Sequence, residues 1–552
     1  MALFLGAAIF LAGASDGFAA GPALTGRVTS DKEGAMEGVL VSAKREGSTV
    51  TTTVVSDGNG QFSFLADRLP PGRYAIAIRA FGYNLDGPKA VDISASGTAT
   101  AMVRLAPTKD VTAQMTNAEW LASAPGDLAI KKRAFGCGQC HTLARPLMST
   151  YTAEDFATKI MPRMASYASQ AYPQLIQTRL APSNRAGRAQ NQTQNGRPNP
   201  LAAYLASINL SNGKTHSYEL KGFARPKGAD TKVVITEYDL PRKTMQPHDV
   251  IVDAAGTVWF SDFGENSLSK LDPKTAKVTE YPYQPTRPGY ANGNLNLEQD
   301  REGKIWVGMM NQTGVARFDP KDGKFEFHPL PASMLNESTQ QAMVAPLHWE
   351  VDGKVWFNDA DNSTLSRMDV RSGTFEPWWN VFTAFPKNGP HGAYGLATDS
   401  QNNLFFLDFP NDYIGRVDAK TGAATFFQVP TPDAHPRRGR MDDQDRLWFA
   451  EWYGGKVGML DPKNGEIKEW PVPDIYAAPY DVVLDKNGQI WTGNDNDDRI
   501  TRIDSNTGRT IQYLMPHEVN VRRVFVDNST AKPTFWAGSN HTASIFKVEP
   551  VE

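Results

Sequence analysis

Cysteine is almost absent from this chain of 552 residues, since only Cys137 and Cys140 occur. A framework of several disulfides is therefore excluded. A basic stripe is also missing, because 57 Lys and Arg are interspersed with 60 Asp and Glu and the net charge is −3. This balance argues against nucleic-acid binding. No run after the N-terminus approaches the roughly 18 apolar residues of a membrane span, so we expect none.

The two cysteines stand in one motif, Cys137-Gly-Gln-Cys140-His141. This C-x-x-C-H spacing predicts covalent c-type haem attachment, with a thioether at each cysteine and the adjacent imidazole as the proximal iron ligand. A local disulfide or half of a zinc site is the alternative. Zinc needs about four ligands, and the chain has no second cysteine pair or histidine cluster to supply them.

The N-terminus and the chain length give the predicted compartment and domain count. Residues 1–20 hold a short apolar run followed by small residues at Ala19 and Ala20, which predicts a secretory signal although no Lys or Arg precedes the run. We therefore expect a periplasmic or secreted protein. The chain is longer than a single hydrophobic core normally accommodates, which favours two or more domains.

Residues 21–107 contain short runs with the alternating pattern of β-strands, separated by Gly, Asp and Ser turns, which predicts a small antiparallel β-sandwich. The run Ser56-Asp-Gly-Asn-Gly-Gln-Phe-Ser-Phe64 and the phrase Leu69-Pro-Pro-Gly-Arg-Tyr74 resemble the carboxypeptidase regulatory-like, transthyretin-like module. The resemblance implies a binding or spacer module.

Residues 108–212 change to helical spacing, with apolar residues around Trp120 before the motif and around Phe156 after it. The segment resembles a small cytochrome c domain, in which a last helix, here 199–208, packs across the first. The resemblance implies one haem c and a methionine as second axial ligand. Met148, Met161 and Met164 are the candidates, and Met164 is preferred. Without a methionine ligand, the open side of the haem would bind small ligands or peroxide.

Residues 231–552 repeat a phrase seen in Asp253-Ala-Ala-Gly-Thr-Val-Trp259 and again in Asp485-Lys-Asn-Gly-Gln-Ile-Trp491. A turn and two strands recurring at about 40–50 residues predict the blade of a β-propeller. The aligned aromatics predict seven blades: Trp259, Trp306, Trp356, Phe405, Trp448, Trp491 and Trp536. Residues 233–238 resemble a spare outer strand, which we expect to complete the last blade. The predicted fold is mainly β: a seven-bladed β-propeller, a small α-helical cytochrome c domain and an N-terminal β-sandwich.

The phrases Trp448-Phe-Ala-Glu-Trp452 and Pro430-Thr-Pro-Asp-Ala434 resemble the virginiamycin B (streptogramin) lyase propellers. In that family, histidines and glutamates hold magnesium and open a cyclic depsipeptide by elimination. The positions that match fall on Arg437, Ala478, Tyr480 and the neighbourhood of Asp495, so only the last acid is retained. Arginine cannot act as a general base, which puts lyase chemistry at these positions in doubt.

The starts of the innermost strands line the channel of a propeller, and there the repeat places a second set of polar residues. They predict a pocket for an anionic or phenolic molecule, or charges paired around a solvated channel. His435, His517 and His541 are predicted surface histidines. The channel candidates are His248, Tyr394, Arg437, Tyr480 and Arg522, with His391 close by.

These observations predict an exported haem protein that couples electron transfer to oxidation or reduction of a small molecule at the propeller, with a redox protein as a further partner. The alternatives are a lyase acting on cyclic depsipeptides and a non-catalytic ligand-binding propeller. A quinohaemoprotein is disfavoured, because both thiols are committed to haem and such rings usually have eight blades.

Overall fold

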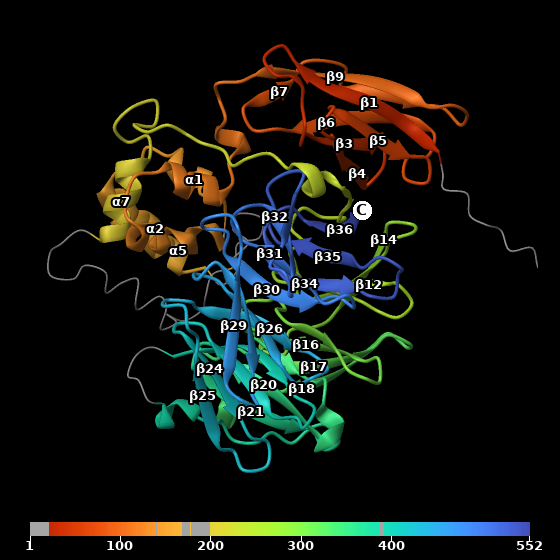
Figure 1. Ribbon diagram of the computed structural model, residues 1–552. Helices are drawn as coiled ribbons and strands as arrows, with labels where there is room; N and C mark the ends of the chain where they lie inside the picture. The colour runs from red at the N-terminus through yellow and green to blue at the C-terminus, as the bar shows by residue number, and fades with distance from the viewer. Residues whose placement is uncertain (1–20, 140, 168–176, 178–198, 386–390, 552) are drawn as a thin grey trace, which may run out of the picture.

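The computed structural model describes residues 21–139, 141–167, 177, 199–385 and 391–551. The chain is mainly β and forms a two-sheet sandwich, a segment of short helices and a long series of antiparallel sheets. Figure 1 shows the sandwich in red and orange above those sheets, and the helices in orange and yellow beside them. The predicted signal segment 1–20 and Cys140 lie outside the described residues.

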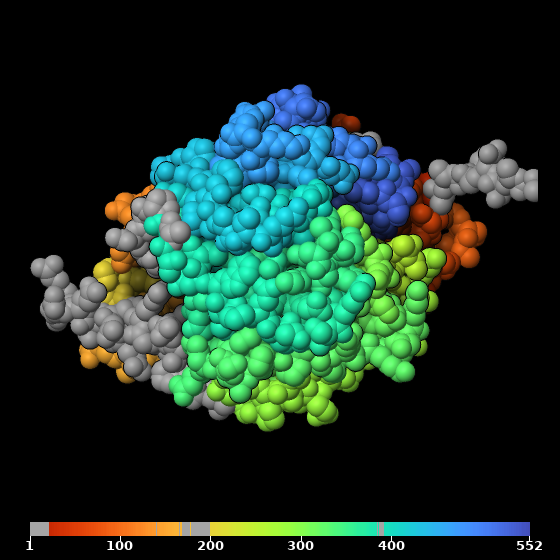
Figure 2. Space-filling view, turned by 90° about the horizontal axis from the view of Figure 1, so that it is seen from below, coloured from red at the N-terminus to blue at the C-terminus, as the bar shows by residue number. Residues whose placement is uncertain are grey.

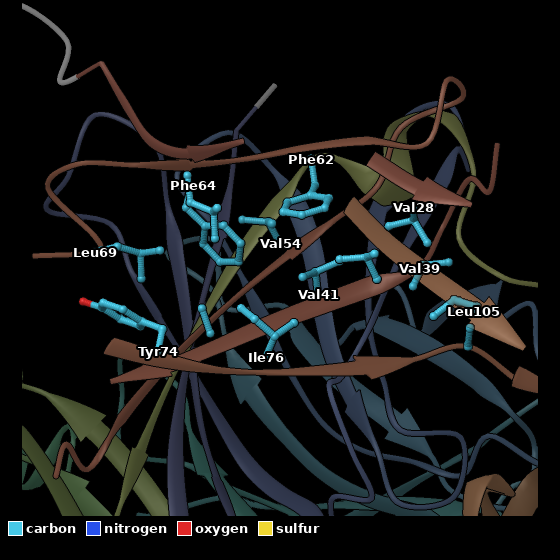
Figure 3. Packing of buried hydrophobic residues seen from close by; sticks show 14 of the residues in the cluster. Val28, Val39, Val41, Val54, Phe62, Phe64, Leu69, Tyr74, Ile76 and Leu105 are labelled. Atoms are coloured by element: carbon cyan, nitrogen blue, oxygen red, sulfur yellow. The ribbon is translucent and has the colours of Figure 1, made fainter. Parts of the chain in front are cut away.

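The first sheet of the sandwich is organised around its first strand, which pairs with three others. The alternation of buried and exposed residues turns Phe62 and Phe64 inward, where they face Val41 and Ile76 of the opposite sheet (Figure 3). The expected sandwich is thus present, and its core is apolar. The strands of this sheet are β1 (Pro22–Ser30), β2 (Gly34–Ala35), β5 (Gln61–Leu65), β7 (Tyr83–Leu85) and β9 (Ala99–Pro107).

The second sheet of the sandwich does not end at the domain boundary. It continues into the last sheet of the C-terminal region, so that eight strands share one hydrogen-bonded ladder. The order across it is β34 (Val521–Asp527), β35 (Thr534–Ser539), β36 (Ser544–Pro550), β10 (Val233–Asp239), β4 (Val50–Val55), β3 (Leu40–Arg45), β6 (Gly72–Arg79) and β8 (Ala90–Ile93).

Strand β10 makes this continuity possible because both of its edges are paired. It pairs antiparallel with β36 on one side and with β4 on the other. The prediction that this strand completes the last unit is confirmed. Its pairing with the sandwich was not predicted. Arg68 of the sandwich adds a bidentate contact to Glu549 of β36, with N–O distances of 2.8 and 3.0 Å.

The helical segment consists of short helices with recognisable caps. Thr116 and Glu119 form a capping box at α1, Asp127 caps α2, and Asn199 caps α7, which has proline at its first position. Within the described residues, none of the helices is long and apolar enough to cross a membrane. The helices are α1 (Asn117–Ser123), α2 (Leu128–Phe135), α3 (Ala144–Leu147), α4 (Ala153–Asp155), α5 (Met161–Ala165) and α7 (Pro200–Ile208); a π-helical turn, Phe156–Ile160, precedes α5.

The C-terminal region adds six further antiparallel sheets, each formed by consecutive strands. The first two are β11 (Pro247–Val252), β12 (Val258–Asp262), β13 (Ser267–Asp272) and β14 (Lys277–Pro282), then β15 (Leu297–Gln299), β16 (Ile305–Gly308), β17 (Gly314–Asp319) and β18 (Lys324–Pro329). The next two are β19 (Val344–Ala345), β20 (Lys354–Asp359) and β21 (Thr364–Asp369), then β22 (Ala393–Thr398), β23 (Leu404–Asp408), β24 (Tyr413–Val417) and β25 (Ala424–Gln428). The last two are β26 (Pro436–Met441), β27 (Leu447–Glu451), β28 (Lys456–Asp461) and β29 (Glu466–Pro471), then β30 (Pro479–Leu484), β31 (Gln489–Asn494), β32 (Arg499–Asp504) and β33 (Thr510–Leu514).

The first strand of each sheet contacts the first strand of the next, and β34 of the last sheet contacts β11 of the first. Figure 2 shows the same succession on the surface, from green through cyan to blue, with the helices at one side.

The repeated Asp-x-x-Gly-x-x-Trp phrase has a physical explanation in the turn between the first two strands. One carboxylate oxygen of Asp253 accepts the backbone N–H groups of Ala255 and Thr257, and the other accepts the indole N–H of Trp259 at 2.8 Å. Gly256 between them has φ 80°, which glycine adopts without strain. The same carboxylate-to-indole bond recurs in three other sheets: Asp300 to Trp306, Asp442 to Trp448 and Asp485 to Trp491.

The third of these sheets departs from the expected four strands. It has three, and the segment after them makes only isolated bridges, from Phe375 to Met368 and from Trp379 to Leu365. Pro377 lies between the two bridges and has no N–H to donate, which interrupts a continuous outer strand.

Replacing Thr52 by proline tests the continuity of the eight-stranded sheet. Thr52 lies opposite Ala43 of β3 and Thr236 of β10, and proline removes the N–H that a central strand donates. We expect the melting temperatures of the sandwich and the propeller region to fall together by several degrees in calorimetry. Ser96→Pro, in the exposed connection between β8 and β9, is the control. Earlier melting of the sandwich alone would show that the shared sheet does not couple the two parts.

Candidate functional site

The cysteine motif lies where the helical segment meets the last sheets of the chain. Helix α2 ends at Phe135, and Cys137 follows in a short 3-10 turn, Gly136–Gln139. His141 comes just before α3. The second cysteine, Cys140, lies outside the described residues.

One pocket brings together three of the four predicted haem residues. It has a volume of about 320 Å³, and its walls include Cys137, His141 and Met164. Met161 lines it as well, whereas Met148 is exposed and does not. The remaining walls are largely apolar with a basic rim; among them are Pro146, Phe156, Ile160, Leu201 and Leu205, and the arginines Arg133, Arg145 and Arg163.

The His141 ring forms a hydrogen bond at the wall of this pocket. Its Nδ1 lies 2.9 Å from the carbonyl oxygen of Thr142, which can only accept, so Nδ1 carries the proton and donates. Burial lowers the pKa of His141, which favours the neutral ring at neutral pH. Nε2 is then the ring nitrogen that would bind iron if haem were attached here.

The donor set of this pocket fits a c-type haem. Haem c uses a cysteine thiol for its covalent link and an imidazole and a methionine sulfur as iron ligands, and apolar walls suit the porphyrin faces. Met161 has one further feature, since its Sδ accepts a hydrogen bond at 3.4 Å from the side-chain amide of Asn199, the cap of α7. Two thioethers thus face the pocket, and one of them is already oriented by the protein.

The motif segment packs directly on the propeller region. The carbonyl oxygen of Gln139 accepts hydrogen bonds from Arg522 Nη2 at 2.6 Å and from His541 Nε2 at 3.3 Å. Lys132 pairs with Asp433 at 2.8 Å. A Cβ at Gly138 would lie only 2.8 Å from the side-chain amides of Asn117 and Asn496, so this position admits glycine alone without a shift.

Aromatic rings extend this contact from the motif toward the channel. Phe135 stacks on Tyr453 with centroids 5.1 Å apart, and it meets Trp452 edge-on at 5.5 Å. The indole N–H of Trp452 donates to Asp495 at 2.9 Å. Sequence reasoning missed Phe135 and Trp452, because single aromatics in a chain rich in them give no signal of a domain contact.

The predicted channel residues form a directed hydrogen-bond chain. His248 Nδ1 lies 2.7 Å from Asp249, so it donates there and leaves Nε2 as an acceptor. The Tyr480 hydroxyl, 3.5 Å from that Nε2, donates to it and accepts from Tyr394 at 2.7 Å. Burial lowers the pKa of His248 to about 4, despite the opposing hydrogen bond with Asp249. The ring is therefore neutral at pH 7.

Arg437 lies beside this chain in a cage of aromatic rings. Its guanidinium carbon lies 4.0 Å from the ring centre of Tyr480 and 4.9 Å from that of Trp452, and the rings of Phe409 and Tyr394 complete the cage. Its Nη1 is 3.7 Å from Asp495. The four groups His248, Arg437, Tyr480 and Asp495 are thus brought together, all of them buried.

Two histidines lie outside the chain of His248, Tyr480 and Tyr394. His391, expected close to the channel, has its Nδ1 2.8 Å from Asp408, and its ring stacks on Phe382. His541, predicted to be a surface histidine, has a side chain only 4% exposed, because it lies between Glu518 and Gln139. A histidine in a loop gives no sequence signal of burial by another domain.

Comparisons with known proteins agree with the two outer parts of this architecture. The model of the virginiamycin B lyase family matches residues 288–518, and that of the carboxypeptidase regulatory-like domain matches residues 23–106. The C-terminal part of the chain is a virginiamycin B lyase-like β-propeller. No curated protein matches the chain.

Solved structures similar to the chain include the selenomethionine form of virginiamycin B lyase from Staphylococcus aureus, with 23% identity, 57% of this chain and 99% of that chain covered, and a TM-score of 0.49. A streptogramin B lyase structure has 23% identity, covers 58% of this chain and 99% of its own, and has a TM-score of 0.49. The extracellular domain of the putative one-component system BT4673 from B. thetaiotaomicron has 17% identity, with 55% of this chain and 40% of that chain covered, and a TM-score of 0.42.

A pair of glycine substitutions tests the fit between the motif segment and the propeller. Gly138→Ala places a methyl group against Asn117 and Asn496, and overpacking of this kind costs about 1–3 kcal/mol. We expect faster hydrogen exchange in residues 128–139 and a lower melting temperature. Gly136→Ala is the matched control, because a Cβ there meets nothing within 4 Å. Equal behaviour of the two variants would contradict the tight seating.

Proposed function

We propose that this chain is an exported c-type haem protein that transfers electrons, with its haem held in the pocket of the helical segment. The observation that carries the proposal is the single pocket lined by Cys137, His141, Met161 and Met164. These residues come from separate helices and turns, and their chemistry matches one prosthetic group. On this proposal, residues 108–212 form a cytochrome c domain.

Each part of the pocket has a distinct task toward the haem. Cys137 and Cys140 would form the thioethers, His141 Nε2 would bind iron, and a methionine sulfur would take the opposite side. Bound haem would supply reversible one-electron chemistry at iron. The largely apolar walls would limit the contact of water with the haem, and the Thr142 carbonyl accepts a hydrogen bond from the ring of His141. Such a protein acts with a redox partner, and the thioethers require export to a compartment where haem is attached.

We further propose that the propeller has seven blades. Six sheets plus the β34–β35–β36–β10 portion of the shared sheet make seven units, and their first strands are neighbours in succession. The contact of β34 with β11 supports a closed ring, and pairing of an N-terminal strand with the last unit holds such a ring shut.

The channel network supports a structural role for the propeller more than an open substrate site. The guanidinium of Arg437 lies among four rings, and Tyr480 is fully buried. Oxidation or reduction of an anionic or phenolic molecule at this point, with His248 as acid or base, stays a prediction. It requires the channel to open.

Lyase activity is the second candidate and has weaker support. The positions that match the catalytic residues of the lyase family are Arg437, Ala478, Tyr480 and Asp495, each at most 3% exposed. Ala478 and Trp452 pack in one apolar cluster with Phe135, and Cys137 packs against it, so the motif segment covers this face. A cyclic depsipeptide could reach these residues only if the helical segment moved away.

The haem assignment predicts a coloured protein. Expressed in a host competent in cytochrome maturation, the wild type should stain for haem after denaturation and show a reduced-minus-oxidised spectrum. We expect His141→Ala to abolish the normal spectrum while circular dichroism shows an intact propeller. His328→Ala, on the outer strand β18, is the control. A colourless wild type would overturn the proposal, and a normal spectrum in His141→Ala would refute the ligand role.

The two pocket methionines predict different spectra. A methionine-ligated ferric haem has a weak long-wavelength band that reports the iron–sulfur bond. Because Asn199 already orients the sulfur of Met161, we expect Met161→Ala to remove this band and Met164→Ala to leave it. The opposite result would assign the ligand to Met164, as the sequence alone suggested.

A further inference from the structure

A groove with a volume of about 670 Å³ lies where the sandwich joins the last sheet of the propeller region. Residues of β1, β5 and β9 line it from the first sheet of the sandwich, and residues of β4 and β10 line it from the eight-stranded sheet. Val551, near the end of the chain, completes the lining. The groove shares no lining residue with the pocket of Cys137 and His141, so it is a separate feature of the chain.

Three large apolar side chains are exposed in this groove. Leu65 of β5, Met102 of β9 and Val551 are 43%, 57% and 51% exposed. Single exposed apolar residues are ordinary on protein surfaces, but a group gathered in one groove is typical of a site where another molecule docks. The three belong to segments far apart in the sequence, so the fold itself brings this apolar surface together.

Strand β5 presents an unpaired backbone edge to the groove, because β1 is its only partner among the described strands. Val28 of β1 donates its backbone N–H to Gly60 at 2.7 Å. Backbone groups of successive strand residues point to opposite edges, so the even-numbered residues of β5 face β1 and Ser63 faces away. On that outer edge, turns already bond the carbonyl oxygens of Gln61 and Leu65. The N–H and C=O of exposed Ser63 are therefore the groups that a further strand would meet.

The charged residues that line the groove favour an acidic partner. Two of them, Arg27 and Lys232, are cations with exposed side chains. The third is Asp57, whose carboxylate accepts the backbone N–H groups of Asn59 and Gln61, both at 2.9 Å, and so belongs to the turn before β5. Complementary charge across an interface selects the partner and suppresses wrong ones.

We propose that this groove is a docking site for an extended peptide segment of a partner protein, one that alternates apolar and acidic side chains. The segment adds a short strand to the outer edge of β5, where it accepts from the N–H of Ser63 and donates to its C=O. Its apolar side chains contact the three exposed apolar residues, and its carboxylates lie near Arg27 and Lys232. In strand addition the main-chain bonds give affinity, and the side-chain contacts give specificity. This inference does not depend on haem.

Two blocked, fluorescein-labelled hexapeptides test the proposal by fluorescence anisotropy with the full chain. One alternates valine with glutamate, and the other alternates valine with lysine. We expect saturable binding of the glutamate peptide and about tenfold weaker binding of the lysine peptide. Ser63→Pro removes the N–H from the outer edge, where an edge strand tolerates proline, and should weaken binding of the glutamate peptide about tenfold. Ser63→Ala keeps the N–H and is the matched control.

Each outcome decides for or against the proposal. Both Ser63 variants should melt as the wild type does, because this N–H does not bond to β1. A glutamate peptide that fails to bind, or that binds Ser63→Pro as tightly as Ser63→Ala, overturns the proposal, and equal affinity for the two peptides refutes the acidic partner. A concentration-dependent wild-type dimer in sedimentation velocity, lost in Ser63→Pro, would assign the groove to a second copy instead. Should Ser63→Pro fail to fold, Lys232→Glu decides: it should weaken binding of the glutamate peptide and strengthen that of the lysine peptide, and no change refutes the inference.

Discussion

Strand β10 is the constraint on which the architecture depends, because it hydrogen-bonds to two parts of the chain at once. Pairing with β36 ties the start of the propeller to its end, and pairing with β4 makes the sandwich an extension of that same sheet. A module tethered by a linker would rotate freely, whereas a continuous ladder of backbone hydrogen bonds fixes its orientation. Arg79 reinforces this by bridging the sandwich to Asp498 of the propeller.

The interior of the propeller shows how buried charge is tolerated here. Arg438 is neutralised by two bonds to Asp249, at 2.7 and 3.1 Å, whereas Arg437 is stabilised chiefly by aromatic faces. Removing one partner of a buried ion pair costs about 3–5 kcal/mol, so a single substitution in a network of this kind strongly destabilises the fold. The side of the network nearest the helical segment is also the side where a cation touches the motif. The buried charge network of the propeller thereby also helps to hold the motif segment in place.

Local signals in the sequence predicted local structure well. The Asp-x-x-Gly-x-x-Trp phrase located the blade turns because its carboxylate-to-indole bond closes within seven residues. The Cys137–His141 motif lies at a pocket, and the strand expected at residues 233–238 pairs with β36. The contacts between domains have no such local signal in the sequence. The burial of His541 and the pairing of β10 with β4 each depend on surfaces that meet only in the folded chain.

The two middle residues of the C-x-x-C-H motif, Gly138 and Gln139, lie against the propeller: a Cβ at the first would make the side chains of Asn117 and Asn496 shift, and the carbonyl of the second accepts from two donors. In this chain these two residues form part of the contact between the helical segment and the propeller. A substitution at either position would therefore alter the seating of the two parts on each other as well as the motif itself.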